Sequence, residues 1–121
     1  MKSPGTLLYV ESPAASARLY GGLLGKEPVE SSPNFVMFQL GAEGMLGLWA
    51  RHDVKPGATP AGGAELCFQV EGKEAVRAAH ADFTARGLRI VQAPAELDFG
   101  YTFTALDPDG HRLRVFAPGQ S

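Results

Sequence analysis

The sequence has little cysteine and little histidine. Cys67 is the only cysteine among the 121 residues, so no intrachain disulfide can form, and a reducing cytoplasm is the expected compartment. With only three histidines beside it, this cysteine cannot supply the ligands of a zinc finger or a zinc ribbon. The sequence also contains no order of Ser, His and Asp that is typical of a catalytic triad, no phosphate-binding loop and no Cys-x-x-Cys pair. These absences exclude several common kinds of catalytic and metal site.

A surplus of positive charge and a long apolar run are also missing. Eleven lysines and arginines stand against thirteen aspartates and glutamates, which gives a formal net charge of −2. Nucleic-acid-binding domains carry a basic surface, so we expect no nucleic-acid partner. Polar and turn-forming residues follow Met1 directly, so we expect no signal peptide, no membrane span and no membrane partner. Together with the cysteine count, these absences predict a cytoplasmic protein.

What the sequence does contain is enough apolar material for one compact domain, since 45% of the residues are hydrophobic and 20% are charged. Ser12 and Pro13 are typical of a helix start, and Gly25 is typical of its end. A second helix is expected over residues 73–86, where apolar residues recur on one face before Gly87. Strands are expected over residues 5–10, 26–31, 35–40, 45–50, 65–70, 100–106 and 111–117, and another begins at residues 89–92 before Pro94 disturbs it.

The order of these expected elements repeats. Residues 4–52 predict the order βαβββ, residues 64–118 predict it again, and residues 53–63 form a linker rich in proline and glycine. A module of about 55 residues cannot bury its sheet alone. We therefore expect one α+β domain in which the two modules pair their sheets.

Two segments carry a family resemblance. One is Glu11–Tyr20 followed by Leu23-Leu24-Gly25, and the other is Phe103–Phe116 with the turn Asp107-Pro108-Asp109-Gly110. They resemble the vicinal oxygen chelate family, which includes glyoxalase I, the bleomycin-resistance proteins and the extradiol dioxygenases. The resemblance covers residues 6–117 and implies the glyoxalase/bleomycin resistance fold, in which two βαβββ modules form a cupped eight-stranded mixed sheet around a cavity. It does not imply one activity, because this fold hosts several.

The positions that hold the metal in this family carry few side chains that could bind a metal ion in this sequence. Its metal-dependent members place His or Glu at four cavity-facing strand positions, and the resemblance puts Gly5, Gly47, Glu65 and Arg114 there. Glycine has no side chain and arginine no lone pair to donate, so we expect no metal, no cofactor and no catalytic residue. We hypothesise that Glu65 and Arg114 form an ion pair at this place. The alternative is that both reach solvent at the cavity mouth and never touch.

Strand alternation from these positions separates cavity-facing side chains from core side chains. The cavity face is expected to hold Leu7, Tyr9, Met45, Gly47, Trp49, Arg51, Glu65, Cys67, Gln69, Arg112, Arg114 and Phe116. The core is expected to hold Leu8, Val10, Leu66, Phe68, Val70, Leu113 and Val115. Phe99 and Tyr101 lie near the rim as candidates for a wall or a lid, with surface packing as the alternative for at least one of them. Flat rings with a few polar groups suit a planar aromatic ligand, and arginine stacks on rings or clamps carboxylates.

The candidate ligand-binding residues are therefore Tyr9, Trp49, Arg51, Glu65, Cys67, Phe99, Tyr101, Arg112, Arg114 and Phe116. For Trp49 the alternative is a place in the core or in a dimer interface. For Cys67 the alternative is a small apolar filler. Gly47 beside Trp49 leaves room above the sheet, which either a ligand or a neighbouring side chain would fill.

These observations favour a protein that binds and sequesters a planar aromatic small molecule, such as an antibiotic, without a metal or a chemical step. The runs Phe35–Phe38 and Leu46–His52 look most similar to the phenazine-resistance type of the family. The resemblance also implies a homodimer, since two modules leave sheet edges unpaired. A rival interpretation is a glyoxalase-like lyase or isomerase with a displaced metal site, built from at least three of His52, His111, Glu65, Asp98 and Glu43. A third is an interaction module with a collapsed cavity.

Overall fold

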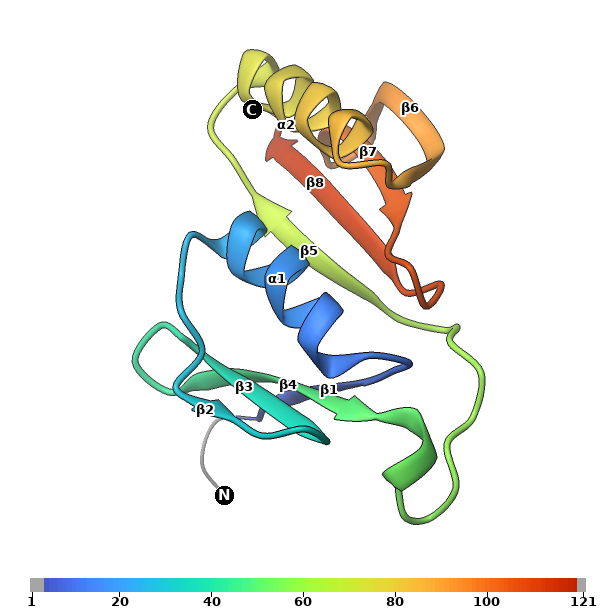
Figure 1. The fold of residues 1–121 in the computed structure, drawn as a ribbon. Helices are drawn as coiled ribbons and strands as arrows, with labels where there is room; N and C mark the ends of the chain where they lie inside the picture. Colours follow the sequence, from blue (N-terminus) through green and yellow to red (C-terminus); the bar gives the residue numbers. More distant parts are fainter. Residues whose placement is uncertain (1–3, 120–121) are drawn as a thin grey trace. The chain divides into compact units, whose positions relative to one another are not determined.

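A computed structural model describes residues 4–119, which divide into two compact units on either side of the Pro60–Ala61 bond (Figure 1). Each unit contains one βαβββ module. The first consists of β1 (Thr6–Val10), α1 (Pro13–Leu24), β2 (Glu30–Ser31), β3 (Phe35–Leu40) and β4 (Gly44–Ala50), followed by the single-turn helix η1 (Arg51–Asp53). The second consists of β5 (Glu65–Gln69), α2 (Lys73–Ala85), β6 (Arg89–Leu97), β7 (Gly100–Leu106) and β8 (Arg112–Pro118). Residues 54–64 carry neither a helix nor a strand.

The ends of α1 lie where the sequence predicts them. The hydroxyl of Ser12 accepts a hydrogen bond from the backbone N–H of Ala15 at 3.2 Å, and Pro13 occupies the first turn. Gly25 ends the helix in the left-handed conformation, with φ of 65°, and its N–H donates to the carbonyl of Gly21. These local partners satisfy backbone groups that a helix end otherwise leaves unpaired.

The sheet of the first module has the strand order β1-β4-β3-β2. β1 runs parallel to β4, and β3 pairs antiparallel with both β4 and β2. α1 packs on one face of this sheet, against β3 and β4. The buried side chains between helix and sheet are Val10, Tyr20, Val36, Phe38, Leu46 and Leu48.

The sheet of the second module has the matching order β5-β8-β7-β6. β5 runs parallel to β8, while β7 pairs antiparallel with β8 and β6. α2 packs against β6, β7 and β8. The ring of Phe103 forms the centre of this core, because the rings of His80 and Phe83 meet it edge to face at 5.3 and 5.2 Å. Edge-to-face packing is a favoured arrangement of aromatic rings.

Two strands differ from their expected bounds by more than one residue at an end. β2 holds two residues, Glu30–Ser31, instead of residues 26–31, and Pro28 precedes it. β6 is longer than expected and continues through Pro94 to Leu97. The reason is that β6 is an edge strand whose register shifts between Ile90 and Gln92 and again between Gln92 and Ala95, and edges and bulges tolerate proline.

The element order confirms the α+β class and the repeated βαβββ arrangement. Eight strands are present in residues 4–119, as two four-stranded mixed sheets, one in each module. Neither helix of the described residues is long and apolar enough to span a membrane.

Candidate functional site

Each sheet has one face covered by its helix and one open face, the side opposite the helix. Burial alternates accordingly: in β8, the helix-side residues Leu113, Val115 and Ala117 are buried, whereas the side chains between them are partly or fully exposed. The same alternation in β4 buries Leu46 and Leu48 and leaves Trp49 half-buried. Strand alternation therefore identifies the helix-side and open-face residues of these strands as the sequence predicts.

The open face of the first module is aromatic. Tyr9 and Trp49 are register partners on β1 and β4, and both side chains are half-buried. Their rings meet edge to face, with centroids 6.4 Å apart. Leu7, two residues before Tyr9, is 46% exposed on the same face. The face therefore presents rings and aliphatic groups to its surroundings.

The space above Gly47 is filled by neighbouring side chains. A Cβ built on Gly47 would lie 2.6 Å from Cδ2 of Leu7 and 2.8 Å from Cζ of Phe35. The sequence left open whether a ligand or a neighbouring side chain fills this space, and the structure shows that the side chains of Leu7 and Phe35 fill it. The glycine lets the Phe35 ring and Leu7 pack directly on the backbone of β4, beside the Tyr9–Trp49 pair.

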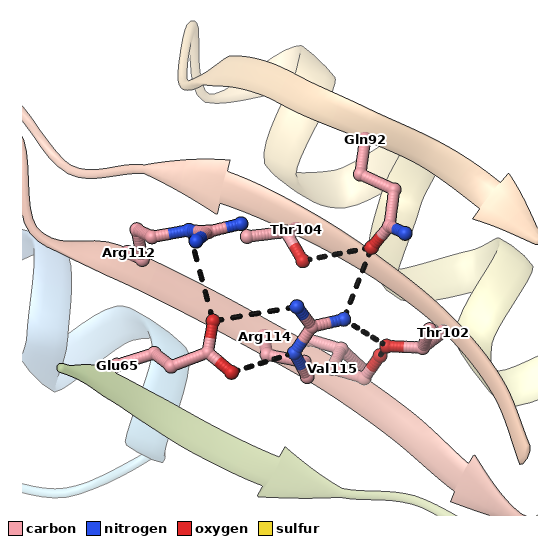
Figure 2. A network of polar contacts seen from close by, with 7 residues as sticks. All are labelled: Glu65, Gln92, Thr102, Thr104, Arg112, Arg114 and Val115. Carbon is pink, nitrogen blue, oxygen red and sulfur yellow. Dashed lines mark hydrogen bonds and ion pairs between the residues drawn. The ribbon is translucent and has the colours of Figure 1, made fainter. Parts of the chain in front are cut away.

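The open face of the second module is centred on an ion pair between Glu65 and Arg114 (Figure 2). Nε of Arg114 donates to Oε1 of Glu65 at 2.8 Å, and Nη2 donates to Oε2 at 3.4 Å. The hypothesised contact between these side chains is thus present. It is bidentate, the geometry in which a guanidinium best matches a carboxylate.

Three further polar side chains complete the network around Arg114. Its Nη1 donates to Oε1 of Gln92 at 3.0 Å and to the hydroxyl of Thr102 at 3.2 Å. The hydroxyl of Thr104 also donates to Gln92, at 3.0 Å, while Thr102 donates to the carbonyl of Val115 at 2.8 Å. Sequence reasoning missed all three residues. Strand alternation along residues 100–106 would have placed both threonines on the open face. The same pattern does not predict the direction of Gln92, because the register of β6 shifts on both sides of it.

Aromatic rings lie at one end of this network. The guanidinium of Arg114 lies over the ring of Phe99, 5.7 Å from its centroid. Phe99 meets Phe116 edge to face at 6.0 Å. Arg112 lies two residues before Arg114 on β8, and its Nε is 3.7 Å from Oε2 of Glu65. The face thus combines rings with guanidinium groups.

Two pKa values of this face are shifted. The pKa of Glu65 is lowered, first by its hydrogen bond to Arg114 and further by the charges of Arg114 and Arg112, so its carboxylate stays ionised. The pKa of the Cys67 thiol is raised, first by partial burial and then by the charge of Glu65. A raised pKa keeps the thiol neutral, which disfavours a nucleophilic role for Cys67.

Two candidate residues lie elsewhere. Tyr101 pairs with Ala117 on the helix side of its sheet, where Lys73 and Arg77 of α2 lie over its ring at 5.4 and 5.1 Å. The structure therefore places Tyr101 on the face opposite Arg114. Arg51 begins η1, because β4 ends at Ala50, so strand alternation does not set the direction of its side chain.

The residues at the expected metal positions do not fit a divalent ion. Gly47 is packed by Leu7 and Phe35, and a Cβ on Gly5 would lie 2.5 Å from Cγ of Met45. The Glu65 carboxylate is held by Arg114, itself a permanent cation without a free lone pair. Among residues 4–119, no three His, Cys, Asp or Glu side chains are grouped so that they could hold a metal ion.

Comparison with solved structures confirms the architecture. An Agrobacterium tumefaciens protein known from solution NMR is 50% identical and superposes with a TM-score of 0.90, over 99% of this chain and 100% of that one. A glyoxalase-related enzyme from Fulvimarina pelagi is 22% identical, with a TM-score of 0.85 over 97% of this chain and 88% of its own. At that identity, the second likeness shows the shared fold.

Sequence comparison identifies the family. The phenazine antibiotic resistance protein EhpR of Enterobacter agglomerans is 28% identical over 112 residues, which are 90% of this chain and 86% of EhpR. The sequence profile of one superfamily matches residues 4–115, and it is the family that the Glu11–Tyr20 and Phe103–Phe116 segments resemble. The chain belongs to the Glyoxalase/Bleomycin resistance protein/Dioxygenase superfamily.

Proposed function

We propose that this protein binds and sequesters a planar aromatic small molecule, such as an antibiotic, without converting it chemically. The observation that carries the proposal is the Tyr9–Trp49 pair, whose rings meet edge to face at 6.4 Å on the open face of the first sheet. Tyr9 and Trp49 are register partners on paired strands, which hold their backbones in place, and both side chains are half-buried, so part of each stays accessible. Fixed aromatic surfaces of this kind favour stacking with another ring system.

The relation to EhpR supports the same ligand class. EhpR is a phenazine antibiotic resistance protein, and phenazine is a planar, fused-ring aromatic compound. Resistance by sequestration needs only binding, so a site with rings and few groups capable of acid–base chemistry is sufficient. The donor set at the expected metal positions, with two glycines and an arginine, favours binding over a glyoxalase-type reaction.

The proposal includes a cytoplasmic homodimer. Within residues 4–119, β1, β2, β5 and β6 are each the outermost strand of a four-stranded sheet. Unpaired edges pair readily with another chain unless they are covered. Analytical ultracentrifugation measures the oligomeric state directly, and a monomer at all working concentrations would contradict the proposed dimer.

Trp49 makes the binding test direct, since it is the only tryptophan of the chain. We expect added phenazine to quench Trp49 fluorescence with saturation, and calorimetry to give the dissociation constant. Tyr9→Leu removes one ring of the pair, and we expect the affinity for phenazine to fall about three- to tenfold, because aromatic contacts contribute about 0.5–1.5 kcal/mol beyond the area that they bury.

Tyr101→Leu is the matched control, because the same change falls on the helix side of the second sheet. We expect it to leave the affinity within about twofold of the wild type, provided that the variant remains folded. Equal losses in both variants would contradict the assignment of Tyr9. Stoichiometric zinc, nickel or manganese in the purified protein, whose removal abolishes an activity, would overturn the proposal in favour of a lyase or isomerase.

A further inference from the structure

Oxygen atoms of the second module converge on one cation, the guanidinium of Arg114 on β8 (Figure 2). They belong to Glu65 on β5, Gln92 on β6 and Thr102 on β7, at 2.8, 3.0 and 3.2 Å. Each of the four strands of this sheet therefore contributes one residue to the cluster. Convergence of carboxylate, amide and hydroxyl oxygens on one positive charge is the arrangement of a cation-binding site.

The hydrogen bonds of the cluster orient its oxygens as acceptors. Thr102 donates its hydroxyl proton to the carbonyl of Val115 at 2.8 Å, so the lone pairs of the same oxygen are available to Arg114. The hydroxyl of Thr104 donates to Oε1 of Gln92 at 3.0 Å. This bond holds the amide with its oxygen, rather than its nitrogen, toward Arg114. The surrounding residues thus prepare both neutral oxygens for a cation.

The charge of the cluster is balanced within it. The two oxygens of Glu65 accept bonds from Nε and Nη2 of Arg114, and the pKa of Glu65 is lowered first by its hydrogen bond to this arginine. The Arg114 side chain is only 13% exposed, and four of its five N–H groups have acceptors. A guanidinium can be withdrawn from water at little cost only when it is paired and hydrogen-bonded in this way.

The same two residues stand at metal positions of the family. The resemblance puts Glu65 and Arg114 at the two metal positions that lie in the second module. At one position the chain keeps an anionic acceptor, and at the other it carries a cation of its own. The carboxylate that a metal ion would need is already bound at both oxygens by the guanidinium.

We infer that Arg114 supplies a built-in cation in place of a metal ion, and that the oxygens of Glu65, Gln92 and Thr102 form a binding site for a guanidinium group. The inference is independent of the ligand proposed for the first module. In the wild type the side chain of Arg114 fills this site, which closes it to divalent ions. Once the guanidinium is removed, the site should accept a small guanidinium compound from solution.

Arg114→Ala with ethylguanidinium tests the inference, because this compound replaces the side-chain atoms that alanine lacks. Thermal unfolding of the full chain, followed by circular dichroism at constant ionic strength, gives the melting temperature. We expect Arg114→Ala to melt about 5–10 °C below the wild type. Ethylguanidinium should raise the melting temperature of the variant but not of the wild type, because a compound that binds the folded chain stabilises it. Ethylammonium should have little effect, since it lacks the planar fork of N–H groups.

Two control variants separate the site from a general effect of the compound. The double variant of Glu65→Gln and Arg114→Ala has the same space but no carboxylate, so ethylguanidinium should not stabilise it. Arg86→Ala breaks the pair between Arg86 and Asp82 on α2, and it should not respond either. Equal shifts in all variants, or no recovery in Arg114→Ala, would overturn the inference. The same holds if Arg114→Ala is unfolded and ethylguanidinium does not restore it.

Manganese provides a test on the unmodified protein. Electron paramagnetic resonance of free Mn²⁺ measures the fraction bound, and we expect no difference in binding between the wild type and Glu65→Gln. Binding of Mn²⁺ by the wild type that is lost in Glu65→Gln would show that the carboxylate is open to a metal ion. That result would overturn the role of Arg114 as the built-in cation.

Discussion

The ion pair between Glu65 and Arg114 should couple these two residues energetically. A double-mutant cycle of Glu65→Gln and Arg114→Met, with the two single variants and the double variant, isolates the interaction from the other effects of each change. The pair lies on neighbouring strands, β5 and β8. The coupling free energy therefore reports how strongly this ion pair stabilises the pairing of the two strands.

The structure sets the expected magnitude. The Glu65 and Arg114 side chains are 29% and 13% exposed, and they make contacts of 2.8 and 3.4 Å. Exposed pairs contribute about 0.2–1 kcal/mol, whereas removing one partner of a buried pair costs about 3–5 kcal/mol. This pair lies between those limits, so we expect a coupling of about 1–2 kcal/mol.

Asp82 and Arg86 on α2 provide a control pair at a similar distance. Their contact is 2.9 Å, but the Arg86 and Asp82 side chains are 34% and 50% exposed. An exposed pair of this helical spacing couples by about 0.3–0.5 kcal/mol. Urea unfolding followed by far-UV circular dichroism gives both couplings, provided that the slopes of the transitions agree. If Glu65 and Arg114 couple no more strongly than Asp82 and Arg86, the reasoning from burial and bidentate geometry is refuted.

Three further predictions concern single residues. The lowered pKa of Glu65 means that the unfolded chain takes up this proton at a higher pH than the folded chain. The contribution of the Glu65 carboxylate to stability is therefore complete at pH values above its ordinary pKa of 4.5, and it is lost as the pH falls through the lower pKa of the folded state. When urea unfolding is followed over this pH range, we expect the free energy of unfolding to fall less steeply for Glu65→Gln than for the wild type. Identical pH profiles of the two proteins would contradict this prediction. Gly47→Ala should lower the free energy of unfolding by about 1–3 kcal/mol, because its Cβ would meet Leu7 and Phe35; an unchanged melting temperature would disprove that packing. Ser12→Ala should cost about 1 kcal/mol in urea unfolding, since it removes the cap of α1, whereas no loss would show that the cap is redundant.

Local sequence signals predicted much of the fold because they act over a few residues. Ser12 with Pro13, and Gly25 at the other end, determine α1 through capping groups and backbone conformations that neighbouring residues provide. Alternation in β8 depends only on the two-residue period of a strand. Starting from the position that the family resemblance gives Arg114, it predicted that Arg114 lies on the open face and Val115 in the core.

Features that depend on strand pairing could not be predicted in this way. The two register shifts of β6 determine that Gln92 faces Thr104 and reaches Arg114. The register of paired strands cannot be deduced from the local sequence of one strand. Pro94 suggested a broken strand, but an edge strand tolerates it. The filling of the space above Gly47 by Leu7 and Phe35 likewise depends on side chains from two other strands.

Tyr101 shows how the choice of face limits site prediction. As an aromatic residue near a strand start, it was a reasonable wall candidate. Its pairing with Ala117 turns it toward α2, where two cations lie over its ring. The sequence thus predicted the strand faces on which Tyr9, Trp49, Glu65 and Arg114 lie, but not the face of Tyr101; that any of them binds a ligand stays a prediction.

The most direct test of this account is a titration of the wild-type protein with phenazine, followed by calorimetry and by the fluorescence of Trp49. The account predicts saturable binding with heat and quenching that follow the same isotherm, and phenazine that is recovered chemically unchanged. Neither heat nor quenching, with phenazine and with a panel of other planar aromatic compounds, would contradict it. Recovery of a converted product would contradict it equally.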